Sequence, residues 1–204
     1  MASFIGFARH RLQTDGKGVT TLAAFHGCPL HCQYCLNPQC NRAECRTIEL
    51  TAQGLYERVK IDQLYFLATG GGVTFGGGEP ALHPDFIVQF RELCGPEWNL
   101  TLESSLNVPA ENVRKLSPVI NNYFIDLKDA NDDIYRRYTG KSNLQVKENL
   151  EWLVAQGITD RIIVRLPRIP DFNTEEDIQR SQEYLENIGI QNIDVFTYRT
   201  DIQK

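Results

Sequence analysis

GCPLHCQYCLNP, residues 27–38, places three cysteines, Cys28, Cys32 and Cys35, in the spacing C-x3-C-x2-C. Thiolates are soft ligands that favour iron–sulfur clusters, zinc or copper. A cubane 4Fe-4S cluster normally takes four cysteines, so three in one short motif would leave one iron open to another ligand. Because an open coordination position distinguishes catalytic metal sites from structural ones, the motif predicts chemistry.

The cysteines could also form a structural zinc site or a disulfide framework. A structural zinc site would need a second pair of ligands, which Cys40 and Cys45 could supply with His31 in reserve. A disulfide framework is disfavoured because six cysteines among 204 residues are not dense. The short apolar stretch at the N-terminus is interrupted by Arg9 and His10, unlike an export signal. We therefore expect reduced cysteines in a cytoplasmic protein.

Composition limits the possible classes of protein. Hydrophobic residues make up 42% and charged residues 23% of the chain, as is usual for a globular protein. The formal net charge of −5 gives no electrostatic signature of nucleic-acid binding. No apolar run approaches the roughly 20 residues that a membrane-spanning helix needs. We therefore expect neither a nucleic acid nor a membrane as a partner.

Short apolar, β-branched runs alternate with amphipathic stretches, which predicts strands alternating with helices. The expected strands are Val19–Phe25, Val73–Phe75, Asn99–Glu103, Tyr123–Leu127, Arg161–Leu166 and Ile193–Tyr198. The expected helices are Ala52–Phe66, Pro84–Leu93, Pro109–Leu116, Asp132–Tyr138, Leu144–Gln156 and Thr174–Ile188. This alternation predicts right-handed βαβ units, and six units fall short of the eight that close a full barrel. The expected fold is α/β, a partial (β/α)6 open barrel with parallel strands, and residues 1–204 are expected to form a single domain.

Unusual residues follow the expected strands, and ligands gather at the carboxyl ends of strands in such folds. The cysteine motif follows the first strand, and the turn GGGEP, residues 76–80, follows the second. Later strand ends carry Glu103, Asp126, Lys128, Arg165, Tyr198 and Arg199. Their coincidence predicts one shared site.

The turn GGGEP combines glycines, whose backbone a ligand can approach closely, with the carboxylate of Glu79. Glycine lacks Cβ, so the backbone at Gly77 and Gly78 can come near a ligand. Backbone carbonyls together with the carboxylate of Glu79 suit an ammonium group. A phosphate would instead need N–H groups and a following lysine, which this turn does not offer.

Together these motifs resemble those of radical S-adenosylmethionine enzymes, and most closely the branch of glycyl-radical enzyme activating enzymes. The opening DGKGVTTLAAFHGCPLHCQYCLNP and the stretch GGGVTFGGGEP are similar to signatures of that branch. The segments IDLK, YTGKSNLQVKENLEWL and IIVRLPRIPDFN follow in the same order. The resemblance extends from about Asp15 to Tyr198.

The resemblance implies a 4Fe-4S cluster, S-adenosylmethionine and roles for matching residues. Cys28, Cys32 and Cys35 would bind three irons. The implied cofactor-binding residues are Tyr34, Asn37, Gly77, Gly78, Glu79, Glu103, Asp126, Lys128 and Arg165. Such an enzyme reductively cleaves S-adenosylmethionine to a 5′-deoxyadenosyl radical, which takes a hydrogen atom from a glycine of a partner glycyl-radical enzyme. The implied electron source is a reductant such as flavodoxin or ferredoxin.

Several residues depart from the pattern of that branch. Glu103-Ser104 stands where the branch has Asp-Thr, which puts a cation site beside the cofactor in doubt. Gly76 replaces a serine, Thr20 an arginine, and Arg199 a histidine. The alternative function is therefore a compact radical enzyme that modifies a small molecule or peptide, and a third is an electron-transfer or zinc protein.

The cysteines outside the motif have no role in the resemblance. Cys40 and Cys45 are too few for a ferredoxin-like insert, and we interpret them as loop residues, with a redox pair or auxiliary ligand as the alternative. Cys94 falls on a helix face and is expected to be buried, since free cysteine packs like a small apolar side chain.

Overall fold

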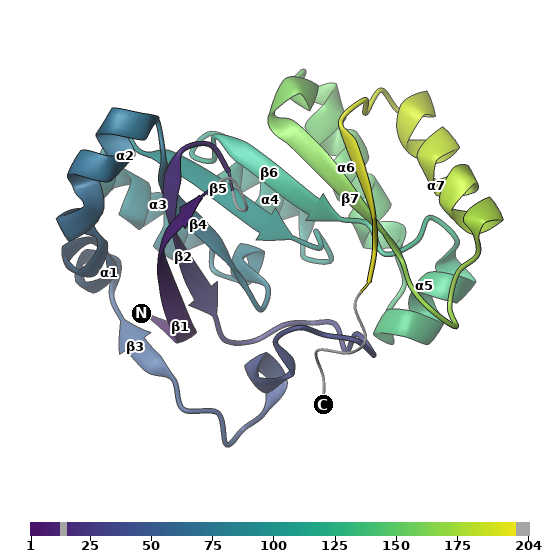
Figure 1. The fold of residues 1–204 in the computed structure, drawn as a ribbon, viewed down its shortest axis with the longest axis horizontal. Helices are drawn as coiled ribbons and strands as arrows, with labels where there is room; N and C mark the ends of the chain where they lie inside the picture. Colours follow the sequence, from purple (N-terminus) through teal and green to yellow (C-terminus); the bar gives the residue numbers. More distant parts are fainter. Residues whose placement is uncertain (13–15, 199–204) are drawn as a thin grey trace.

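A computed structural model describes residues 1–12 and 16–198; Arg199, a predicted strand-end residue, lies outside them. The described strands form one sheet in the order β3-β1-β2-β4-β5-β6-β7-β8 (Figure 1). They are β1 (Ala2–Leu12), β2 (Val19–Phe25), β3 (Ile48–Leu50), β4 (Gly72–Gly77), β5 (Asn99–Ser104), β6 (Asn122–Asp126), β7 (Ile162–Arg168) and β8 (Ile193–Thr197). Strands β2 and β4 to β8 pair in parallel, which confirms the predicted strands and the α/β class.

Two strands, β1 and β3, were not predicted. Strand β1 pairs antiparallel with both β2 and β3, and it places β3 at the edge of the sheet. Only Ala2 and Phe4 of β1 are buried, so the strand has little of the alternation that marks a half-buried strand. Strand β3 is only three residues long. Neither strand therefore gives a clear local pattern.

Helices connect the parallel strands. They are α1 (Ala52–Val59), α2 (Gln63–Thr69), α3 (Pro84–Cys94), α4 (Ala110–Leu116), α5 (Asp132–Thr139), α6 (Leu144–Ala155) and α7 (Glu175–Asn187). Short 3-10 turns cover Pro38–Asn41, Lys60–Asp62, Pro80–Leu82 and Thr159–Arg161. The last five helices agree with the predicted ones to within a few residues. No helix in the described ranges is long and apolar enough to cross a membrane.

The prediction of one continuous helix over Ala52–Phe66 is wrong. A 3-10 turn over Lys60–Asp62 separates α1 from α2. The carboxylate of Asp62 is fully buried and accepts hydrogen bonds from Arg9 Nε at 2.8 Å and Arg9 Nη2 at 2.6 Å. His10 Nε2 lies 2.9 Å from the same carboxylate. Because these contacts hold Asp62 against β1, the helix is interrupted at this residue.

The alternation of side chains along each strand separates two faces. One face is apolar and packs under the helices, with the ring of Phe75 5.5 Å from that of Phe90 and 6.0 Å from that of Phe25. The opposite face carries Glu103 and Asp126 at the ends of β5 and β6. Arg165 lies on the same face but in the middle of β7, because this strand continues to Arg168, beyond the predicted end. The sheet thus places its charged residues on the face that the helices leave open.

Candidate cofactor site

The predicted site residues converge at the carboxyl ends of the parallel strands. The pairing of Asp126 with Arg165 places the end of β6 beside the middle of β7. A cavity of about 660 Å³ opens at this edge of the sheet. The predicted residues that line it are Cys28, Cys32, Cys35, Asn37, Gly77, Gly78, Glu79, Glu103, Asp126, Lys128 and Arg165. Tyr198, also predicted at a strand end, lines the cavity as well.

Among the predicted cofactor-binding residues, all of which lie in the described part of the chain, Tyr34 alone does not line this cavity. Its ring packs against the rings of Tyr138, at 6.2 Å, and Phe172, at 5.9 Å. Its hydroxyl donates a hydrogen bond to Asp171 Oδ2 at 3.4 Å. The side chain therefore supports the back of the cysteine loop, and its contact with an adenine stays a prediction.

The loop that carries the cysteines is anchored by Asn41, a residue that the sequence analysis did not identify. Asn41 Oδ1 accepts a hydrogen bond from the backbone N–H of Cys28 at 2.8 Å, and Asn41 Nδ2 donates to the carbonyl of Leu30 at 2.8 Å. The backbone N–H of Gly27 also donates to the carbonyl of Cys40 at 2.7 Å. The 3-10 turn over Pro38–Asn41 therefore folds back under the motif and fixes its start.

The far side of the cysteine loop rests on the end of α5. The backbone N–H of His31 donates to the carbonyl of Thr139 at 2.9 Å, and that of Gln33 donates to the carbonyl of Tyr138 at 3.1 Å. Figure 1 shows this segment leaving β2, crossing to α5 and returning toward β3. The motif is thus supported on one side by the turn Pro38–Asn41 and on the other by the end of α5.

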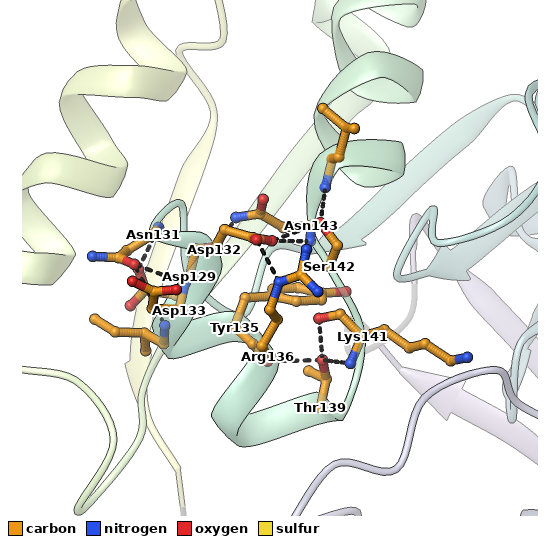
Figure 2. A network of polar contacts seen from close by, with 12 residues as sticks. Asp129, Asn131, Asp132, Asp133, Tyr135, Arg136, Thr139, Lys141, Ser142 and Asn143 are labelled. Atoms are coloured by element: carbon orange, nitrogen blue, oxygen red, sulfur yellow. Dashed lines mark hydrogen bonds and ion pairs between the residues drawn. The ribbon is translucent and has the colours of Figure 1, made fainter.

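Polar contacts fix the α5 end in turn, in the predicted segment YTGKSN. Figure 2 shows Asp132 at the start of α5 facing the loop after it, where its Oδ1 accepts hydrogen bonds from Ser142 Oγ at 2.7 Å and the backbone N–H of Asn143 at 2.8 Å. Asn143 Nδ2 donates to the carbonyls of Asp129 and Ala130. These bonds join the two ends of α5 and hold the carbonyls that receive the cysteine loop.

The glycine turn after β4 packs directly on the backbone that leads into the cysteine motif. The backbone N–H of Gly78 donates to the carbonyl of Phe25 at 2.9 Å, and that of Glu79 donates to the carbonyl of Gly27 at 2.8 Å. Gly77 has a φ of +89°, a conformation that favours glycine. Asn37 Nδ2 donates to the carbonyl of Gly77 at 3.3 Å. The turn and the motif therefore form one unit.

The carboxylate of Glu79 is buried beneath this unit and is engaged by protein donors. Its oxygens accept hydrogen bonds from Ser104 Oγ at 2.7 Å, Ser105 Oγ at 2.7 Å and the backbone N–H of Ser105 at 2.9 Å. The backbone N–H of Ala81 adds a fourth at 3.1 Å. Burial raises the pKa of Glu79, and these hydrogen bonds offset only part of the rise. Glu79 joins the glycine turn to the end of β5.

A chain of ion pairs crosses the same edge. Lys128 Nζ lies 3.0 Å from Asp126 Oδ2, Arg165 Nε lies 2.7 Å from Asp126 Oδ1, and Arg165 Nη1 lies 3.2 Å from Glu103 Oε1. Burial alone would raise the pKa of Asp126, but Lys128 and Arg165 bring it below its ordinary value. Burial alone would lower the pKa of Lys128, but Asp126 together with Tyr198, Cys32 and Tyr138 raises it above its ordinary value. Asp126, Lys128 and Arg165 are therefore charged near neutral pH.

The three motif thiols lie in different surroundings. Burial, followed by the nearby Glu79 carboxylate, raises the pKa of Cys28 to about 12, and burial also raises that of Cys32. A hydrogen bond from the Cys40 thiol lowers the pKa of Cys35. Cys40 is only 2% exposed and packs beside this motif cysteine, and its interpretation as a loop residue, with a redox pair or auxiliary ligand as the alternative, stays a prediction.

The other remaining cysteines lie apart from this contact. The Cys45 thiol donates to the carbonyl of Arg46, and Cys94 is half-buried against the core, less enclosed than predicted.

The donor set fits an iron–sulfur cluster better than a closed zinc site. Within the described parts of the chain, no three His, Cys, Asp or Glu side chains gather closely enough to hold a single metal ion. Three soft thiols of one loop instead border a single cavity, as a cluster whose irons bind separate thiolates requires.

The fold and this site agree with comparisons to known proteins. The family model of the Radical SAM superfamily matches residues 23–185, and the chain belongs to that superfamily. Members use a 4Fe-4S cluster and S-adenosylmethionine, and the chain is accordingly a radical S-adenosylmethionine enzyme. Within the superfamily its relatives are activating enzymes, which confirms the predicted branch.

Two of these relatives are pyruvate formate-lyase activating enzymes. The one from Clostridium pasteurianum is 30% identical over 189 residues, which cover 91% of this chain and 78% of the relative. The pyruvate formate-lyase 2-activating enzyme of Escherichia coli (strain K12) is 28% identical over 231 residues, covering 97% of this chain and 77% of the relative. The chain thus spans about three quarters of these relatives.

Solved structures share the fold at low sequence identity. Streptococcus suis SuiB bound to the precursor peptide SuiA has a TM-score of 0.66 at 15% identity, covering 87% of this chain and 38% of SuiB. TYW1 with a lysine-pyruvate adduct has a TM-score of 0.58 at 18% identity, covering 91% of this chain and 66% of TYW1. These likenesses support the partial barrel.

Proposed function

We propose that this chain reductively cleaves S-adenosylmethionine and uses the resulting radical to remove a hydrogen atom from a glycine of a partner glycyl-radical enzyme. One observation carries the proposal: the three motif cysteines, the glycine turn and the charged strand ends line a single cavity. The similarity to pyruvate formate-lyase activating enzymes supports the choice of a polypeptide glycine as the substrate.

The cysteine loop and the glycine turn would hold the cluster and the amine. Cys28, Cys32 and Cys35 would bind three irons, which leaves the fourth for the amine and carboxylate of S-adenosylmethionine. The carbonyls of Gly77 and Gly78 would accept hydrogen bonds from the amine. Glu79, whose oxygens already accept four hydrogen bonds, would keep this turn in place and add negative charge behind it.

The charged strand ends would bind the carboxylate and the rest of the cofactor. Lys128 and Arg165 supply positive charge, while Asp126 and Glu103 orient them through the ion pairs. Asn37, which ties the two loops together, would line the cofactor on the other side.

The bound cofactors supply radical chemistry that no side chain can supply. With the cluster held by Cys28, Cys32 and Cys35, one-electron reduction of bound S-adenosylmethionine would supply a 5′-deoxyadenosyl radical, with methionine as the other product. The glycine Cα of the partner would give its hydrogen atom to this radical, which would become 5′-deoxyadenosine, and would keep the unpaired electron. Apolar walls that include Leu22, Leu30 and Phe196 would limit the access of water during these steps.

The setting of the activity is part of the proposal. We infer that the chain works as a single domain over residues 1–204 in the cytoplasm, with flavodoxin or ferredoxin as the reductant. The net charge of −5 argues against a nucleic-acid substrate.

Anaerobic reconstitution with iron and sulfide tests the proposal. The reconstituted chain should contain about four irons, form 5′-deoxyadenosine when reduced with dithionite in the presence of S-adenosylmethionine, and generate a glycyl EPR signal on a glycyl-radical enzyme from the same organism. Cys32→Ser should lose both products. Cys94→Ser, whose thiol lies outside the cavity, is the matched control and should keep them.

The outcomes separate the two halves of the proposal. A chain that binds about four irons but forms no 5′-deoxyadenosine contradicts the cleavage step. Formation of 5′-deoxyadenosine without a glycyl signal on such partners contradicts the polypeptide substrate and favours the alternative, a small molecule or peptide.

A further inference from the structure

Gly76 and Glu103 are neighbours on the cavity face of the sheet. The register that pairs Phe75 with Leu102 places Gly76 beside Glu103 on adjacent strands. A Cβ added to Gly76 would lie 2.7 Å from Glu103 Oε2 and 3.1 Å from Leu22 Cδ1. Gly76 is not among the glycines with a positive φ, so its backbone conformation does not require glycine. A strand glycine of this kind marks a close approach, here by the Glu103 carboxylate.

The other oxygen of that carboxylate holds Arg165. Glu103 Oε1 accepts from Arg165 Nη1 at 3.2 Å, while Asp126 Oδ1 accepts from Arg165 Nε at 2.7 Å. The guanidinium also lies over the ring of Phe124, 5.5 Å from its centre. Because the guanidinium is planar and rigid, two fixed nitrogens determine where the third points. The group is 21% exposed, and so one side of it remains open to the cavity.

We propose that Gly76 and Glu103 form a matched pair that positions Arg165 for the carboxylate of S-adenosylmethionine. Gly76 leaves the space that the Glu103 side chain occupies, and Glu103 in turn fixes the direction of the Arg165 fork. Glu103 is thus a positioning residue that acts through Arg165. This inference rests on the proposed function, since it assigns the carboxylate of that cofactor to Arg165.

Binding of two ligands tests the pair. In reconstituted protein, the affinity for S-adenosylmethionine is compared with that for its decarboxylated analogue, which lacks the group that Arg165 would bind. Gly76→Ala should displace the Glu103 carboxylate and reduce the preference for S-adenosylmethionine about tenfold. Adding Glu103→Asp to Gly76→Ala should not restore the preference, because the shorter side chain clears the new methyl group but no longer reaches Arg165.

Two controls separate position from charge and from folding. Glu103→Gln keeps the length of the side chain and an oxygen that accepts from Arg165, so it should change the preference by less than threefold. Gly6→Ala adds a methyl group where nothing lies within 4 Å and should change nothing. In thermal unfolding of the metal-free protein, Glu103→Asp should restore the stability that Gly76→Ala loses, because the shorter side chain withdraws from the new methyl group.

The results that would overturn the inference are distinct from those that would overturn the function. Wild-type protein that binds neither ligand contradicts the proposed function. Wild-type protein that prefers S-adenosylmethionine, together with an unchanged preference in Gly76→Ala or no recovery of thermal stability in the double variant, contradicts the matched pair. A large loss in Glu103→Gln shows that charge, not position, is what Glu103 supplies.

Discussion

Gly78→Ala should separate the glycine turn from the cysteine loop. A Cβ at this position would lie 2.2 Å from the carbonyl oxygen of Gly27 and 3.0 Å from that of Phe25. A normal carbon–oxygen contact is about 3.3 Å or longer, so the two backbones must move apart by about 1 Å. Both neighbours are backbone atoms, which cannot turn aside as the Glu103 side chain can beside Gly76.

The cost follows from that displacement. Overpacking of a close contact costs about 1–3 kcal/mol, and weakening of the two hydrogen bonds from Gly78 and Glu79 to the carbonyls of β2 and Gly27 adds about 1 kcal/mol. We expect the free energy of unfolding to fall by about 3 kcal/mol. For a domain of this size, that corresponds to a fall in Tm of about 6–12 °C.

Urea unfolding of the metal-free protein, followed by circular dichroism, measures this loss. Gly6→Ala, in a strand but with nothing within 4 Å of the new carbon, is the matched control and should unfold within about 0.5 kcal/mol of wild type. Iron content after reconstitution should fall in Gly78→Ala as well, because the start of the cysteine loop moves. If Gly78→Ala unfolds at the same urea concentration as Gly6→Ala, the packing argument is refuted.

Three other substitutions examine the supports of the site. Asn41→Leu removes both hydrogen bonds to the cysteine loop and should cost about 1–2 kcal/mol and lower iron content; full iron occupancy would contradict its anchoring role. Glu79→Gln places an amide among hydroxyl and N–H donors and should destabilise the metal-free protein by about 2 kcal/mol in urea; an unchanged midpoint would speak against this network. The pKa of Asp132 is lowered to about 2, chiefly by its hydrogen bond from Arg136, so its carboxylate stabilises the fold above about pH 4 and this contribution is lost as the pH falls toward 2. Because Asp132 is 39% exposed, solvent screening limits the contribution to about 1 kcal/mol, and Asp132→Asn should abolish this acid-dependent part; an identical pH profile in the variant would disprove the assignment.

The parallel strands could be predicted from the sequence because each has a local signal, an apolar run that ends in a polar residue. Strand β1 had no such signal, since its pairing with β2 and β3 is decided by contacts across the sheet. The break between α1 and α2 could not be predicted from the local sequence either, because Asp62 is held by Arg9, 53 residues earlier in the chain. Local periodicity cannot report a partner at that distance.

The residues of the candidate site also fall into two groups, those that the sequence predicted and those that it did not. Spacing and chemistry pointed to Cys28, Cys32 and Cys35, and the structure brings all three to the cavity. Asn41 has no distinguishing pattern, because its importance lies in the backbone groups that its amide reaches. The contact between Cys40 and Cys35 could not be predicted either, because it depends on the 3-10 turn that contains Cys40.

The support of the cysteine loop by α5 has a consequence for the order of events during synthesis. His31 and Gln33 are made early, but the carbonyls of Thr139 and Tyr138 that hold them are made much later. Contacts between distant parts of a chain form only after the intervening loop has closed, and domains fold as units when enough of the chain is available. A nascent chain that ends before Thr139 therefore has its thiols but lacks their support, and iron is best delivered to the completed chain.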